Sequence, residues 1–254
     1  MLIFCYHRLY SSAAGSPLVP SRKNFYSVAA EDFRQHLAFL SRHRFRTLLI
    51  DEFLDSPSLA DSKDVMITFD DGNESDLTLA LPLLQEFGFR AVFFICIEYV
   101  GQPGYLSWEQ VKSLLAAGMS VQSHGLLHHD LTKVPTVELI DELTAARICL
   151  ERNLDRDIRY LAIPGGLMDG RVCFAAQQAG YDVVCSSVPG VAHPGQRLPR
   201  IAIRHSTTQM NFEAMVLGSS WNIFRKHLVY RGAACLKRVV GIEGYEALKM
   251  RLWS

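Results

Sequence analysis

The stretch Asp64-Val65-Met66-Ile67-Thr68-Phe69-Asp70-Asp71-Gly72 runs from an apolar segment into two acids and a glycine. The apolar residues predict a buried strand, and Asp70 and Asp71 lie where it ends. Adjacent side chains on a strand point to opposite faces, so both carboxylates serve one site only if the backbone turns, which Gly72 permits. An Asp-Gly pair is also common in ordinary turns. Two buried acids, by contrast, need a cation or a proton-transfer role.

A second polar stretch, Ser123-His124-Gly125-Leu126-Leu127-His128, follows the apolar segment 118–122. On one helical turn, His124 and His128 would share a face, and two neutral imidazoles there can bind one divalent metal. Two histidines and one carboxylate leave a coordination position open for water, as a catalytic zinc requires, and either Asp70 or Asp71 can supply that carboxylate. The histidine spacing is a moderate signal alone, but together with the acid pair it indicates a metal site.

These two stretches resemble the motifs of the polysaccharide deacetylase family, carbohydrate esterase family 4, which has the NodB-homology domain. Residues 68–72 match its first motif, T-F-D-D-G, without a change. Its second motif, S-H-[ST]-x-x-H, is matched by Ser123, His124 and His128, with Gly125 where Ser or Thr is usual.

The third motif of the family, F-A-Y-P-[YG]-G in the subgroup that this chain resembles, is matched more loosely. Here it reads Leu161-Ala162-Ile163-Pro164-Gly165-Gly166. The order and spacing of the matches agree over roughly residues 1–215. Softer similarities lie at residues 5–8, 81–84, 106–110 and 198–201.

The resemblance implies roles for five residues. Asp71, His124 and His128 would hold the metal, and Asp70 would be the general base that takes a proton from the metal-bound water. The backbone N–H of Gly165 would complete an oxyanion hole. Zinc is the expected metal for two histidines and one aspartate, although cobalt, nickel or manganese could occupy the same ligands.

Two departures from the family pattern affect this site. Gly125 lacks a hydroxyl that in relatives can support the histidine loop, and a backbone group or a water could substitute for it. Ala162 and Ile163 stand where other branches carry an arginine that contacts the base. We predict that Arg200 supplies this charge from a neighbouring strand end.

The general acid is a further residue to assign. In relatives it is often a histidine near the end of the barrel. His205 is the closest in position and is predicted to be the acid. His7 and His193 are the alternatives.

Strand and helix signals alternate along the chain, which predicts an α/β fold with a largely parallel sheet and the site at the C-terminal strand ends. The resemblance implies a distorted (β/α)7 barrel, here as a single domain over residues 1–217. A long loop is predicted at residues 9–28, and long helices at residues 31–43 and 136–153. Strands are predicted at residues 1–6, 45–50, 64–69, 91–97, 118–122, 159–163, 181–186 and 201–203.

Residues 218–254 form a separate tail with seven basic and two acidic residues. Trp221, Phe224 and Leu228 fall near one helical stripe, so we predict a basic amphipathic helix. Such a helix can lie on an anionic membrane surface, or it can pack on the barrel with a solvated basic face. The membrane alternative suits an enzyme whose substrate is a sugar on a lipid carrier.

Composition narrows the function classes. Of the 254 residues, 49% are hydrophobic and the formal net charge is zero, so the chain is an ordinary globular protein with no field that favours nucleic acid. None of the six cysteines forms C-x-x-C, and we expect reduced core thiols. Residues 1–6 are too short for a signal sequence, so we expect a cytoplasmic protein that can reach the inner face of the membrane.

The predicted function is a metal-dependent carbohydrate N-deacetylase. It would hydrolyse an N-acetyl group on a sugar of a polysaccharide, oligosaccharide or glycolipid during surface-glycan biosynthesis. The alternatives are an O-deacetylase or other deacylase on the same metal site, and a non-catalytic carbohydrate-binding relative. No obligate protein partner is inferred, and the sequence does not identify the sugar, the polymer length, the lipid carrier or the oligomeric state.

Overall fold

The computed structural model describes residues 1–11, 25–55 and 63–218 of the chain. The predicted tail helix lies outside the described residues, as does most of the predicted loop at residues 9–28. The described ends of that loop form two short strands, β2 (Leu9–Tyr10) and β3 (Val28–Ala29), which pair in parallel.

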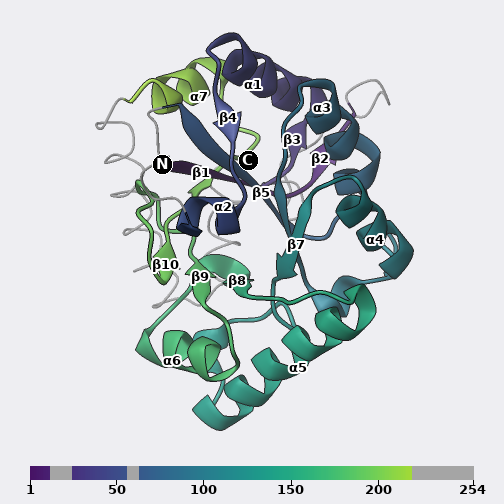
Figure 1. Ribbon diagram of the computed structural model, residues 1–254, viewed down its shortest axis with the longest axis vertical. Coiled ribbons are helices and arrows are strands. Elements are labelled where there is room, and N and C mark those ends of the chain that lie inside the picture. The colour runs from purple at the N-terminus through teal and green to yellow at the C-terminus, as the bar shows by residue number, and fades with distance from the viewer. Residues whose placement is uncertain (12–24, 56–62, 219–254) are drawn as a thin grey trace, which may run out of the picture.

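The main sheet is parallel and curls around the centre of the molecule (Figure 1). Its strand order is β10-β9-β8-β7-β6-β5-β1-β11, and β4 pairs with the start of β5. The strands are β1 (Leu2–Tyr6), β4 (Arg46–Thr47), β5 (Asp64–Asp71), β6 (Val92–Ile95), β7 (Ser120–Ser123), β8 (Tyr160–Ala162), β9 (Val183–Cys185), β10 (Arg197–Leu198) and β11 (Ile201–Ala202).

Helices surround this sheet (Figure 1). They are α1 (Ala30–Arg42), α2 (Ile50–Asp55), α3 (Leu81–Glu86), α4 (Trp108–Ala116), α5 (Thr136–Leu154), α6 (Gly170–Gln178) and α7 (Gln209–Val216). The α/β prediction is therefore confirmed. The predicted strand at residues 45–50 is wrong beyond Thr47, because Leu49 donates its N–H to Glu52 (2.8 Å) and α2 begins at Ile50.

Alternation along the strands divides the core in two. Phe4 and Phe69 belong to a cluster between the sheet and the outer helices. Ile3 and Met66 point the other way, into a smaller cluster inside the curled sheet, together with Phe53 of α2. Strand β5 is therefore buried on both faces, which explains its continuous apolar sequence.

The inner cluster fills the end of the barrel where the strands begin. On β1 and β5 the same inward face becomes polar two residues further along, with Cys5 on β1 and Thr68 and Asp70 on β5. The interior thus changes from apolar packing to chemically active groups towards the C-terminal strand ends, where sites of parallel α/β barrels lie. Within the described residues, no helix combines the length and the apolar composition needed to cross a membrane.

Candidate active site

The two acids reach one site because the backbone turns at the end of β5. Asp71 has φ +80° and Gly72 has φ +78°. A side chain at φ > 0 costs about 1–2 kcal/mol, so the turn places strain on Asp71 itself. Gly72 is fixed by space as well, since a Cβ there would lie 3.1 Å from Cδ1 of Ile95.

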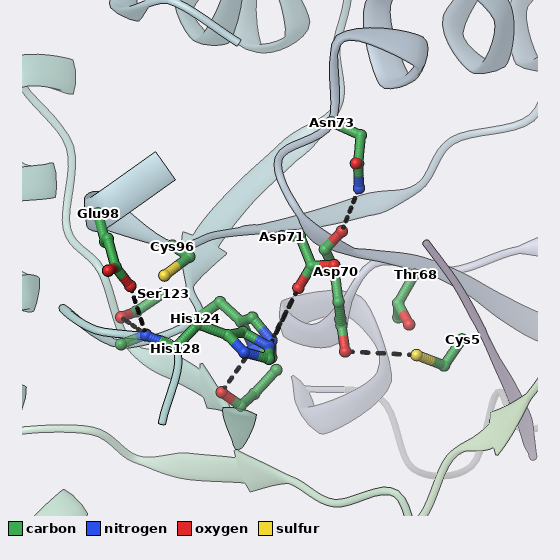
Figure 2. A network of polar contacts seen from close by, with 12 residues as sticks. Cys5, Thr68, Asp70, Asp71, Asn73, Cys96, Glu98, Ser123, His124 and His128 are labelled. Atoms are coloured by element: carbon green, nitrogen blue, oxygen red, sulfur yellow. Dashed lines mark hydrogen bonds and ion pairs between the residues drawn. The ribbon is translucent and has the colours of Figure 1, made fainter. Parts of the chain in front are cut away.

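The histidine segment is an irregular loop after β7, and His124 and His128 do not share a helical turn. Gly125 has φ +85°, which breaks any helix after His124. The loop nevertheless brings the two rings to a centroid separation of 5.3 Å. Nε2 of His124 and Nε2 of His128 each lie 3.4 Å from Oδ1 of Asp71 (Figure 2).

These three side chains fit a divalent metal. Their ligand atoms all lie within 4.8 Å of one another, and Oδ1 of Asp71 is buried without a hydrogen-bond partner in the described part of the chain. His124 Nδ1 lies 3.0 Å from the carbonyl oxygen of Ala162, which orients the other ring nitrogen towards Asp71. Two imidazoles and one carboxylate form a zinc-type donor set with room for a further ligand.

The histidine loop is held by contacts with neighbouring segments. Glu98 accepts a hydrogen bond from the backbone N–H of His128 (3.0 Å), and its own N–H donates to the carbonyl oxygen of Leu126 (2.9 Å) (Figure 2). The Tyr99 ring stacks on His128 at 5.6 Å. On the other side, Glu142 of α5 pairs with His129 (2.9 Å). A carboxylate and backbone groups therefore position the loop.

Arg200 and Asp70 form the most buried polar contact of the site. Nη1 and Nη2 of Arg200 donate to Oδ1 (2.6 Å) and Oδ2 (2.8 Å) of Asp70. Arg200 also contacts Thr68 Oγ1 (3.2 Å) and lies over the Phe94 ring. Burial alone would raise the pKa of Asp70, but Arg200 and the nearby His124 outweigh it and lower the pKa to about 2. The arginine expected beside the base therefore lies there.

Cys5 of β1 and His7, just past the end of that strand, reach the same carboxylate. The Cys5 thiol donates to Oδ2 of Asp70 over 3.4 Å, and a ring nitrogen of His7 lies within 4.8 Å of both groups. The signal in the sequence was alternation: Cys5 lies on β1, which pairs with β5, and His7 follows two residues later, directly after the strand ends, so both can face Asp70. Cys5 is a buried thiol as predicted, but it contacts the proposed base.

The two other candidate acids lie elsewhere. Nδ1 of His205 is 3.1 Å from the carbonyl oxygen of Phe25, and its ring meets the Phe25 ring edge-on. His193 is exposed. Within the described residues, the clusters that could bind a metal include His7 and neither of these two histidines.

Gly165 lies in the turn Pro164–Gly166, with φ +64°. Pro164 faces the histidine loop, because a Cβ on Gly125 would be 3.4 Å from its Cγ. The third motif thus adjoins the proposed metal ligands. The role of the Gly165 N–H in an oxyanion hole stays a prediction.

Comparison with known proteins agrees with this fold. Residues 59–184 match the family model described as polysaccharide deacetylase. YxkH of Bacillus subtilis (strain 168), named as a polysaccharide deacetylase, is 26% identical over 179 residues, which cover 69% of this chain and 64% of YxkH. A poly-beta-1,6-N-acetyl-D-glucosamine N-deacetylase of Staphylococcus aureus (strain MRSA252) is 24% identical over 197 residues, covering 70% and 68%.

Solved structures show the same barrel. Streptococcus pyogenes deacetylase PplD, in complex with acetate, superposes with a TM-score of 0.73 at 22% identity, covering 83% of this chain and 95% of that one. IcaB from Ammonifex degensii gives 0.72 at 24% identity, covering 85% and 97%. The fold is that of a carbohydrate esterase barrel, as predicted. The chain thus resembles the polysaccharide deacetylase family in sequence over residues 59–184 and in its fold.

Proposed function

We propose that this protein is a carbohydrate N-deacetylase that depends on one divalent metal, with zinc as the first choice. The observation that supports this most directly is that the adjacent residues Asp70 and Asp71 face different groups. Asp71 faces the imidazoles of His124 and His128. Asp70 faces Arg200, Cys5 and His7. One acid is thus placed to bind a metal and the other to move a proton.

The reaction replaces the amide C–N bond of an acetamido group with a C–O bond from water, giving acetate and a free amine. A metal held by Asp71, His124 and His128 would polarise the acetyl carbonyl and lower the pKa of the attacking water. Asp70 accepts the proton of that water, and Arg200 fixes the orientation of its carboxylate. The N–H of Gly165 donates to the oxygen that gains negative charge.

The departing nitrogen needs a proton, and His7 is better placed than His205 to provide it. Its ring lies against the Asp70 carboxylate and is stacked on Tyr26 at a centroid distance of 4.7 Å. Burial lowers the pKa of His7, which favours release of a proton once it is protonated. We therefore propose His7 as the general acid in place of His205.

The substrate proposed is an N-acetylated sugar in a polysaccharide, oligosaccharide or lipid-linked glycan. The similarity to an N-deacetylase of poly-beta-1,6-N-acetyl-D-glucosamine supports an acetamido sugar. A cytoplasmic location is part of the proposal, supported by the five free thiols in the described residues. Contact of the tail with the inner membrane face is also proposed. Sedimentation with anionic vesicles at low salt tests it, and absence of binding would exclude it.

The test of function is acetate release from β-1,6-linked N-acetylglucosamine oligomers, compared with O-acetylated oligomers of the same length. We expect amide hydrolysis by the metal-loaded protein and its loss in Asp70→Asn. Asp71→Ala and His128→Ala should lose the metal as well as activity. Asp182→Asn, an exposed acid outside the site, is the control. Faster ester hydrolysis would favour an O-deacetylase, and sugar binding without either product would favour a non-catalytic relative.

A further inference from the structure

A second set of metal-binding atoms lies beside the proposed ligands. It comprises Cys5 Sγ, a ring nitrogen of His7 and a carboxylate oxygen of Asp70, all within 4.8 Å of one another. We propose that Cys5, His7 and Asp70 form a second, weaker site for a thiophilic divalent metal such as zinc or cadmium, and that filling it inhibits the enzyme.

The backbone already arranges these donors. Cys5 lies on β1 and His7 directly past the end of that strand, and both lie beside the end of β5 that carries Asp70. In a tetrahedral site with Zn–S of about 2.3 Å and Zn–O of about 2.1 Å, neighbouring donor atoms are about 3.6 Å apart. Sγ of Cys5 and Oδ2 of Asp70 are 3.4 Å apart, so this pair is near ligand geometry (Figure 2).

The imidazole is available as the third donor. Nδ1 of His7 is buried and has no hydrogen-bond partner among the described residues, so binding through it would break no contact. Stacking on Tyr26 limits the rotation of the ring. A small movement of this side chain would close the site.

Arg200 does not use all the acceptor positions of the Asp70 carboxylate. A carboxylate offers about four lone-pair positions, and Arg200 uses one on each oxygen. The Cys5 S–H points to another on Oδ2. The ion would take the place of this thiol proton: the S–H bond breaks, a metal–sulfur bond forms and the proton leaves to solvent, without any change of oxidation state.

The same neighbours explain why this site is the weaker one. The Arg200 guanidinium, and an ion held by Asp71, both repel a second cation at this distance. Occupancy is therefore expected only with excess metal. The inhibition rests on the proposed function, because the ion would occupy the proposed base and the proposed acid at once.

The experiment starts from protein loaded with one equivalent of zinc, in which Cys149, Cys173 and Cys235 are replaced by serine. Cadmium is then added, and thiolate-to-metal charge transfer is followed in the near ultraviolet together with proton release. The first site offers no sulfur, so the band reports the second. We expect one further equivalent, with the band, and acetate release falling to below about a tenth of its starting rate.

Cys5→Ser should abolish the band and weaken binding of the second equivalent about 100-fold or more, while the first equivalent stays bound. His7→Gln keeps the thiol and should weaken the second equivalent similarly. No band, or an equal band in Cys5→Ser, overturns the proposal. If Cys5→Ser does not fold, unchanged binding in His7→Gln overturns it. A second ion that binds to a protein without deacetylase activity would refute the proposed function and leave this site standing.

Discussion

Arg200 clasps Asp70 through both of its terminal nitrogens, at 2.6 and 2.8 Å, with both side chains shielded from solvent. The two residues are 130 positions apart and meet because β11 pairs with β1, next to β5. Removing one member of such a buried ion pair destabilises the fold, because the other charge is then left buried without a partner.

Replacing Arg200 with alanine should leave the Asp70 carboxylate buried without its ion-pair partner. We expect a loss of about 3–5 kcal/mol in the free energy of unfolding. Turnover should fall by about 100-fold or more, because the base loses its orientation. Metal content should not change, since the ligands are separate side chains. Arg34→Ala removes an exposed pair with Glu86 and is the matched control. Unchanged turnover in Arg200→Ala would remove Arg200 from the mechanism.

Exchanging the candidate acids separates them. His7→Gln should lower the rate of amide hydrolysis about 100- to 10,000-fold and remove the basic limb of the pH–rate profile. His205→Gln should keep that profile, because His205 is engaged with Phe25. If only His205→Gln lost the basic limb, the general acid would be His205.

Glu98 should affect metal binding without being a ligand. Because it holds the N–H of His128, Glu98→Ala should weaken the metal about 10- to 100-fold. Glu98→Gln retains an acceptor and should recover most of that affinity. Glu138→Ala, an exposed change on α5, is the control. Equal affinities in all three variants, measured by competition with a chelating dye, would contradict this role.

Restoring the family's usual serine at Gly125 should be harmful here. The residue has φ +85°, so Gly125→Ser should lose about 1–2 kcal/mol of stability and also displace the loop against Pro164. Gly88→Ser carries comparable backbone strain, with φ +67° and open space, and should lose similar stability but no metal affinity. Tighter metal binding in Gly125→Ser would contradict this prediction and would show that a hydroxyl at this position strengthens the metal site.

His36 should make the fold sensitive to acid. Burial lowers its pKa to about 3, whereas the unfolded chain binds that proton near pH 6.5. Between these values the unfolded state binds more protons, so stability should decrease as the pH falls. The full effect is roughly 4 kcal/mol by pH 3.

His36→Met should flatten this dependence in urea titrations at several pH values. Tyr6→Phe removes the hydrogen bond to Nδ1 (3.0 Å) but keeps the ring buried against Phe212, so it should retain the dependence. The same slope in His36→Met would assign the acid sensitivity to other groups.

The sequence was sufficient for the barrel and for the neighbourhood of the site. The apolar run before Asp70 and the spacing of His124 and His128 are local signals, and a resemblance to a known family made them specific. Arg200 could be suspected because a motif position lacked its arginine. The short strand at 46–47 could not be predicted correctly, since Leu49 and Glu52 cap a helix within an apolar segment.

The remaining errors have one physical cause. The histidine loop and the ring of His7 are placed by contacts between segments far apart in the chain, such as Glu98 with His128 and Cys5 with Asp70. Periodicity reports which face a residue occupies, but it does not report which residue of another strand lies opposite. Position in the sequence favours His205, whereas position in the sheet favours His7, which we propose as the general acid.

The pairing of β1 with β11 sets limits on truncation. The segment matched by the family model, residues 59–184, contains all three proposed metal ligands but neither of these strands. A fragment cut to those boundaries would lack Cys5, His7 and Arg200, and β5 would become an exposed edge. It would keep the three proposed metal ligands but no partner for Asp70, so transplanting this chemistry into another scaffold requires both β1 and β11.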